Sequence, residues 1–193
     1  MKNTNGKKLI TSAMFALAVL FMSACNNNKP EDTKEVAEEH NDAKFDNAKE
    51  DDAKFLVSAA EINLEEIQLG QLAQTRGTTT HVKELGKMME TEHTKALADL
   101  QNLAAKKQII IPISLTENGM DANKKLLETK GSKFDKEYAD MMVSGHKNAI
   151  DIFQKAADEA LDPDIRNWAT TMLPVLRIHL DHSNNCQKLC EKM

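Results

Sequence analysis

Apolar residues recur every three or four positions along four long stretches of the chain. In the first stretch the stripe includes Ile62, Leu69 and Leu72, and Glu65 interrupts it between apolar neighbours. A repeat of about 3.6 residues places such positions on one face of an α-helix. The pattern therefore predicts four long amphipathic helices, at residues 53–76, 79–107, 132–160 and 163–193.

The residues at the ends of these stretches are typical of helix boundaries. Gly77 follows the first helix, where glycine suits a C-terminal cap. Ser132, followed three residues later by Asp135, is similar to the capping box that begins a helix. Asp162 and Pro163 suit an N-cap and a first helical position. These signals separate the stretches into distinct helices.

The connection between the second and third long helices has a pattern of its own. It begins with IIIPIS, where Pro112 requires an extended chain that we expect to pack across one end of a bundle. A short helix is predicted next, at residues 116–129. The chain has only 7 Gly and 4 Pro, and no stretch alternates as a strand would. We therefore expect an all-α fold: a four-helix bundle with a short extra helix in the middle connection.

The first residues have the organisation of an export signal. MKNTNGKKLI carries three lysines, an apolar run follows, and small residues precede Cys25. The apolar run is too short to span a bilayer. LFMSAC resembles a bacterial lipobox, in which the cysteine is lipidated and becomes the mature N-terminus, and ordinary cleavage nearby is the alternative. We expect residues 1–24 to be a lipoprotein signal peptide and Cys25 to be the lipidation site.

Lipidation at Cys25 would hold the protein on a membrane without a spanning segment. Asn26 follows the cysteine, and by resemblance to the sorting rules of Gram-negative bacteria we expect an outer-membrane lipoprotein of the cell envelope, facing the periplasm or the exterior. Residues 25–52 are rich in charge and poor in large apolar groups, so their burial would not offset the entropy of ordering them. We expect an acidic disordered tether there, followed by the bundle domain at residues 53–193.

Several motifs occur in a recognisable order along the predicted bundle. They are FLVSAAEINLEEIQLGQLA, MMETEHTKALADLQNLAAKKQIIIP, FDKEYADMMVSGHKNAIDIFQKAA and DPDIRNWATTMLPVLRIHL. From Phe55 to His182 the chain resembles the domain of unknown function 4142 (DUF4142) family, a ferritin-like helical domain of exported bacterial proteins. The resemblance implies a ferritin-like bundle in the envelope and implies no established reaction.

Polar residues interrupt the inward stripes of the predicted helices. Metal sites of ferritin-like bundles are built from inward carboxylates and histidines on facing helices. Glu65, His93, His146 and His179 each belong to a different long helix, and a cluster of the four would give each a partner. Because imidazole suits Zn, Cu, Fe or Ni, these residues are candidate ligands of one transition-metal ion.

Other interpretations of these residues stay open. Glu90, in a Glu-x-x-His pair with His93, and Glu61 are secondary ligand candidates. The same groups could instead form a buried hydrogen-bonded network that fixes helix register without any metal. An iron-dependent oxidase is a third interpretation, but it needs about four carboxylates and two histidines, and the third long helix supplies no inward glutamate.

The last helix carries a second group of potential ligands, within HLDHSNNCQKLC. His179, His182, Cys186 and Cys190 follow steps of three, four and four, which place them on one side of a helix. Thiolates with imidazoles could bind Cu or Zn, although one straight helix does not easily surround an ion. In an oxidising envelope the cysteines could instead form a strained local disulfide or an exposed thiol pair.

Charge and motif content narrow the function classes. Asp and Glu number 30 against 25 Lys and Arg, so the net charge of −5 leaves no basic surface of the kind that nucleic acids require. No phosphate loop, cofactor fingerprint or nucleophile–base set supports a hydrolase. We expect a lipid-anchored envelope protein of unknown biochemical role. It is either a metal-binding or stress-related module, or a structural or protein-interaction bundle; its oligomeric state is not predicted.

Overall fold

The described part of the protein consists of helices joined by short connections, without a strand. The computed structural model describes residues 32–45 and 47–192. The helices are α1 (Thr33–Lys44), α2 (Asn47–Arg76), α3 (Thr80–Lys107), α4 (Glu117–Leu127), α5 (Ser132–Glu159) and α6 (Pro163–Cys190). The expected all-α bundle is therefore confirmed. The predicted signal peptide and Cys25 lie outside the described residues.

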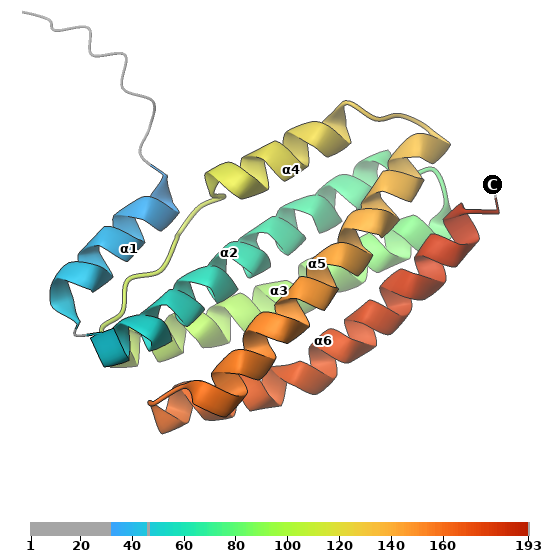
Figure 1. Cartoon of the computed structure of the whole chain (residues 1–193). Coiled ribbons are helices and arrows are strands. Elements are labelled where there is room, and N and C mark those ends of the chain that lie inside the picture. Colours follow the sequence, from blue (N-terminus) through green and yellow to red (C-terminus); the bar gives the residue numbers. More distant parts are fainter. Residues whose placement is uncertain (1–31, 46, 193) are drawn as a thin grey trace, which may run out of the picture.

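The four long helices form two antiparallel pairs, α2 with α3 and α5 with α6, which lie side by side (Figure 1). Helices α3 and α5 run in the same direction, so the chain between them travels the length of the bundle. The short extra helix predicted in this connection is present as α4, which packs along α2 and also contacts α5. At the start of the connection, Ile109 and Ile111 are buried at one end of the bundle, as IIIPIS predicts.

A buried carboxylate of α5 holds the turn between α2 and α3. Asp135 accepts hydrogen bonds of 2.8–3.0 Å from the backbone N–H groups and the hydroxyls of Thr78 and Thr79. The predicted capping box at Ser132 was therefore wrong, since Gly131 is the N-cap of α5 and Asp135 serves another helix start. Spacing along one segment does not reveal a cap that comes from a different helix.

A carboxylate of α2 plays the equivalent role at the opposite turn. Asp52 accepts hydrogen bonds from the N–H groups of Leu161 and Asp162, at 3.0 and 2.8 Å. Asp162 in turn accepts from the N–H groups of Asp164 and Ile165, which confirms it as the N-cap of α6. Each helix pair therefore supplies a buried aspartate that fixes the turn of the other pair.

A helix occupies much of the segment that we expected to be a disordered tether. Helix α1 packs on α2, with Ala37 fully buried and Asn41 2% exposed. The amide of Asn41 donates to the Ile110 carbonyl at 2.7 Å and accepts from the Ile110 N–H at 2.9 Å. The expectation of disorder was wrong for residues 33–44 and 47–52. Composition concealed this helix because a polar side chain, rather than apolar area, anchors it.

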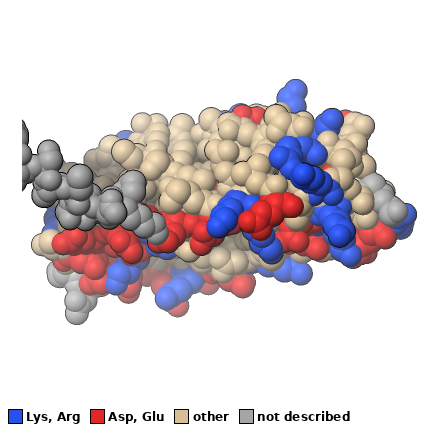
Figure 2. All heavy atoms as spheres, turned by 90° about the horizontal axis from the view of Figure 1, so that it is seen from above, with Lys and Arg blue, Asp and Glu red and all other residues tan. Residues whose placement is uncertain are grey.

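Charged side chains of both signs share the surface of the bundle. In Figure 2, which shows the molecule from above the view of Figure 1, Lys and Arg lie among Asp and Glu. Lys34 pairs with Glu61 across α1 and α2, and Lys125 pairs with Glu137 across α4 and α5, at 2.6 and 2.5 Å. Among the helices that the structure describes, none is both long enough and apolar enough to cross a membrane.

Candidate metal centre

Three histidines meet at the centre of the bundle. His93 of α3, His146 of α5 and His179 of α6 are 2%, 0% and 3% exposed, so bulk solvent hardly reaches their side chains. They lie between two apolar clusters that fill the two ends of the bundle. Their chain neighbours show this, because Met89 and Met142 belong to one cluster, and Leu176 to the other. The predicted inward orientation of the histidines is confirmed.

The three imidazole rings form a nearly equilateral triangle. Their centres are 5.5 Å apart for His93 and His146, 5.2 Å for His93 and His179, and 5.4 Å for His146 and His179. One potential ligand nitrogen from each ring lies within 4.8 Å of the other two. Three imidazoles bound to one tetrahedral ion through bonds of about 2.0 Å would have ring centres about 5 Å apart. The spacing is therefore close to that of a metal site.

Hydrogen bonds define which nitrogen of two rings is free to bind. The amide nitrogen of Asn63 donates to the Ala59 carbonyl, so its oxygen faces His93 and accepts from Nδ1–H at 3.0 Å. Nδ1–H of His146 donates to the Met142 carbonyl at 2.8 Å. Both rings consequently carry their lone pair on Nε2. This second contact is the one that fixes the tautomer of metal-binding histidines in proteins.

The three histidines and the buried polar residues around them form a polar layer, called the histidine layer below. Several buried polar atoms of this layer have no hydrogen-bond partner in the described part of the chain. They are Nε2 of His93, Nε2 of His146, Nδ1 of His179, Oε2 of Glu66 and the hydroxyl of Tyr138. Buried polar groups in native proteins are nearly always partnered, because an unpaired group costs about 1–3 kcal/mol. A closed network would pair these atoms with one another. The structure instead leaves one ring nitrogen of each histidine unpartnered, and it brings one potential ligand nitrogen of each ring within 4.8 Å of the other two.

Burial keeps the imidazoles in the neutral form that binds metals. It lowers the pKa of His146 and of His179 to about 4. The pKa of His93 is lowered well below its usual value, first by burial and then by the two neighbouring imidazoles. Near neutral pH the three rings are therefore unprotonated and need lose no proton to bind a cation.

Glu66 of α2 supplies the carboxylate beside the histidines. Its Oε1 is 3.5 Å from Nδ1 of His146, and the residue is 5% exposed. Burial, reinforced by the charge of Glu65, raises the pKa of Glu66 well above its usual value. A dication among the histidines would reverse this shift, since it favours the ionised form. A Cβ at Gly145 would lie 3.2 Å from Oε1, so the glycine leaves room for the carboxylate.

Glu65 does not join the histidine layer, and the prediction that placed it there was wrong by one position. Its Cβ lies 3.7 Å from where a Cβ of Gly119 would be, which locates it beneath α4. Helix α2 is covered by the bundle on one side and by α1 and α4 on another. The apolar stripe of α2 is broad for this reason. Asn63 and Glu66 are the buried polar residues on the side that faces the bundle, whereas Glu65 is on the side that faces α4.

The two secondary carboxylates have other partners. Glu61 binds Lys34, Thr116 and Asn118 at the junction of α1, α2 and α4. The carboxylate of Glu90 accepts from the amides of Gln71 and Gln74, and these hydrogen bonds lower its pKa. Neither residue belongs to the group of potential ligands formed by the three histidines.

The cysteines of α6 form a second group with a histidine that the sequence pattern missed. Potential ligand atoms of His81, Cys186 and Cys190 lie within 4.8 Å of one another. His182 is exposed and His179 belongs to the central layer, so the predicted set along one helix was wrong. Both cysteines are free and buried, which also contradicts an exposed thiol pair. His81 was missed because it belongs to α3, far from the cysteines of α6 in the sequence, so no local spacing links them.

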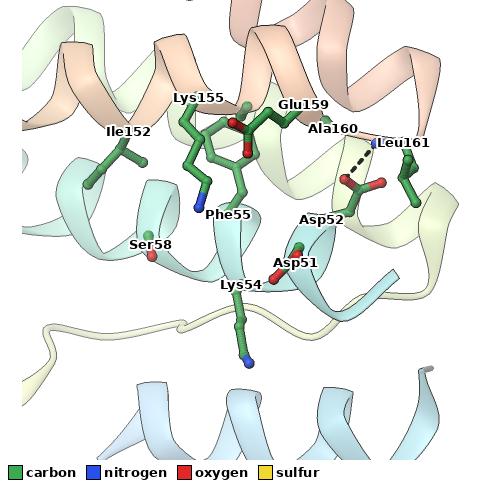
Figure 3. Close-up of a pocket in the computed structure, with 11 residues that line it drawn as sticks. Asp51, Asp52, Lys54, Phe55, Ser58, Ile152, Lys155, Glu159, Ala160 and Leu161 are labelled. Carbon is green, nitrogen blue, oxygen red and sulfur yellow. Dashed lines mark hydrogen bonds between the residues drawn. The ribbon is translucent and has the colours of Figure 1, made fainter. Parts of the chain in front are cut away.

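A surface groove of about 400 Å³ lies between the start of α2 and the end of α5 (Figure 3). Phe55 and Ile152 contribute apolar surface, while Lys155 and Glu159 place opposite charges on it. Asp52, at one end, is already engaged with the Leu161 N–H. The groove therefore gathers no set of unpartnered polar groups comparable to the histidine layer.

Comparison with known proteins identifies the domain. The family model described as Domain of unknown function (DUF4142) matches residues 35–185, which include α2 to α5 and the three central histidines. The chain belongs to this family. Neither a curated protein nor a solved structure matches it. Cys186 and Cys190 follow the matched region.

Proposed function

We propose that this DUF4142 domain is a metal-binding module that holds one transition-metal dication between His93, His146 and His179. The observation that carries the proposal is the convergence of one potential ligand nitrogen from each of three buried histidines on three helices, each of which also has an unpartnered ring nitrogen. Hydrogen bonds already fix two of the rings in the tautomer that presents Nε2. The donor set suits Zn²⁺, Cu²⁺, Ni²⁺ or Fe²⁺, because neutral imidazole binds all four.

Three histidine ligands would leave at least one coordination position for another group. Glu66 lies 3.5 Å from Nδ1 of His146, and its charge would balance part of the charge of the ion. A bound metal of this kind supplies Lewis acidity. The described layer contains one glutamate beside three histidines, so its donors favour a single ion over the carboxylate-rich pair of an iron-dependent oxidase.

Metal content in matched variants tests the proposal. The purified protein, in a Cys186→Ser, Cys190→Ser background that removes the two thiols of α6, is equilibrated with Zn²⁺, desalted and measured by elemental analysis. We expect about one zinc per chain, and less than about a tenth of that in His179→Ala, because even indirect support of a ligand is worth tenfold or more. His182→Ala is the control, since His182 lies on the same helix and is exposed.

The alternative is a metal-free bundle whose polar layer fixes helix register, which the bonds of His93 to Asn63 and of His146 to Met142 would support. A protein that folds with full helicity but retains no Zn²⁺, Cu²⁺, Ni²⁺ or Fe²⁺ would establish that alternative. His146→Gln serves as a second variant in case His179→Ala lowers helicity. Equal metal content in both site variants and in the control would also overturn the proposal.

We also propose that Cys25 is lipidated and anchors the domain to the outer membrane. The support is the sequence LFMSAC after a basic and apolar leader, followed by Asn26. In a Gram-negative host the chain is expected in the outer-membrane fraction, with a lipid-modified N-terminus by mass spectrometry. Cys25→Ser should abolish the modification and move the protein out of that fraction. Unchanged mass and fractionation of the variant would exclude the anchor.

A further inference from the structure

A thiol and imidazole cluster lies at the end of the bundle where α3 begins and α6 ends. His81 is in the first turn of α3, and Cys186 and Cys190 lie in the last turns of α6. The cysteines are 4% and 5% exposed, and their sulfurs lie within 4.8 Å of the imidazole. We propose that His81, Cys186 and Cys190 bind a zinc ion, at a site separate from the central histidines.

The distances suit tetrahedral zinc. Zinc bonds of about 2.3 Å to sulfur and about 2.0 Å to nitrogen place adjacent S and N ligands about 3.5 Å apart. In the structure Sγ of Cys190 is 3.5 Å from Nε2 of His81. Only a small adjustment would be needed to bring both atoms onto one ion.

A disulfide between the cysteines fits less well. They are four residues apart on one helix, where Cβ atoms are about 5–6 Å apart. A disulfide needs Cβ atoms about 3.5–4.5 Å apart, so closing it would distort the last turn of α6. A metal ion spans the larger separation without moving the backbone, and His81 supplies a ligand from a second helix.

The charges of the proposed ligands match those of a divalent cation. Zinc binding would release the two S–H protons and form two Zn–S bonds and one Zn–N bond, with no change of oxidation state. Two thiolates balance the charge of Zn²⁺ and leave the buried site neutral. The carboxylate of Asp135 is held by the Thr79 hydroxyl, which itself lies 3.2 Å from Nε2 of His81, so a negative charge close to the cluster favours a cation. The C-terminal end of α6 adds to this preference through its helix dipole.

The hydroxyl of Thr79 is one of two contacts of Nε2 of His81. This hydroxyl donates to Asp135 at 2.8 Å and lies 3.2 Å from Nε2. Because its proton is committed to the carboxylate, the hydroxyl can only accept from Nε2–H, so an ion bound at Nε2 would replace this contact and the ring proton would move to Nδ1. The other contact of Nε2 is the Cys190 sulfur, which is the direction in which the ion would lie.

Cobalt, which occupies tetrahedral zinc sites, gives the test. In a reduced Cys25→Ser variant the only thiols are those of Cys186 and Cys190. We expect Co²⁺ to produce sulfur-to-cobalt charge-transfer absorption, which stoichiometric Zn²⁺ abolishes. The Cys186→Ser, Cys190→Ser double variant should remove the band, and His81→Ala should weaken zinc binding by tenfold or more. His182→Ala is the control, which should leave band and affinity unchanged.

The outcome is independent of the central histidines. A site made only of imidazoles gives cobalt no sulfur charge transfer, so His179→Ala should leave this band intact while it removes metal from the other site. If the reduced protein has two titratable thiols, remains helical and shows no sulfur–cobalt band, the proposal is overturned. An unchanged zinc affinity in both His81→Ala and the milder His81→Gln would exclude His81 as a ligand.

Discussion

Individual residues of α2 decide what faces the centre of the bundle. Asn63 and Glu66 are nearly inaccessible and reach the histidines, whereas Glu65 lies beneath α4. Burial, together with the charge of Glu61, raises the pKa of Glu65 to about 7. Two adjacent glutamates thus have different roles, one beside a candidate metal and one under a covering helix.

Replacing Glu65 by Gln should stabilise the protein in alkaline solution. The folded pKa of about 7 exceeds the ordinary value of 4.5, so the unfolded chain ionises first and stability falls as pH rises from 4.5 through 7. Glu65→Gln removes this loss. We expect a gain of about 1–2 kcal/mol in the free energy of unfolding at pH 8 and almost none at pH 4.5, measured by urea denaturation.

Glu84 gives a matched control for this substitution, because it is an exposed glutamate of α3. Glu84→Gln should change stability by less than about 0.5 kcal/mol at both pH values. A Glu65→Gln variant that is equally stable with the wild type at pH 8 would show that Glu65 is ionised and well solvated in the folded protein.

Helices α2 and α3 approach each other through two glycines. A Cβ at Gly86 would lie 2.7 Å from the carbonyl oxygen of Gly70, and a Cβ at Gly70 would lie 2.6 Å from that of Gly86. Backbone atoms at such distances cannot move aside as a flexible side chain can. This contact lets the pair bring Asn63 and His93 within hydrogen-bonding distance, so it positions the candidate metal centre.

Gly86→Ala should therefore destabilise the protein although alanine favours helices. The expected net loss is about 1–3 kcal/mol, since overpacking exceeds the gain in helix propensity of about 1 kcal/mol. Lys87→Ala, at the exposed neighbouring position, is the control and should change stability by less than about 0.5 kcal/mol. Thermal and urea unfolding measure both. A Gly86→Ala protein more stable than the wild type would contradict the close approach of the helices.

The sequence could predict elements better than the contacts between them. Its periodicity gives the four long helices and α4 within about three residues, except that α2 begins at Asn47 and not at residue 53, and it orients His93, His146 and His179 inward. It could not distinguish Glu65 from Glu66, because a helix covered on two sides has two inward faces. The sequence also could not show that His81 joins the two cysteines, because this depends on a contact between α3 and α6, which are far apart in the sequence.

Across the whole molecule, a polar layer divides the apolar interior into two clusters. The layer is costly without a ligand, since it buries three imidazoles and a carboxylate with few partners. A bound ion would stabilise the fold by an amount that grows with its free concentration. The residues of this polar layer therefore affect metal affinity, acid sensitivity and fold stability together.

The metal-free protein should lose stability as the pH falls from about 6.5 toward 4. The folded pKa is about 4 for His146 and His179 and well below its usual value for His93, whereas unfolded histidines protonate near 6.5, so protons favour the unfolded chain in this interval. Glu65 and Glu66 act in the opposite direction, because their folded pKa values are raised. Three histidines outnumber two glutamates, so the net free energy of unfolding should still rise with pH.

Urea denaturation in the presence of a chelator, at several values between pH 4.5 and 6.5, measures this slope. Glu66→Gln should make it steeper by about 1 kcal/mol per pH unit, since it removes one opposing proton. His182→Ala, which changes an exposed histidine, should leave the slope unchanged. Zinc should add stability at pH 6.5 and progressively less toward pH 4, where protons compete for the imidazoles. A flat profile in the metal-free wild type would mean that the central histidines remain open to protons in the folded state.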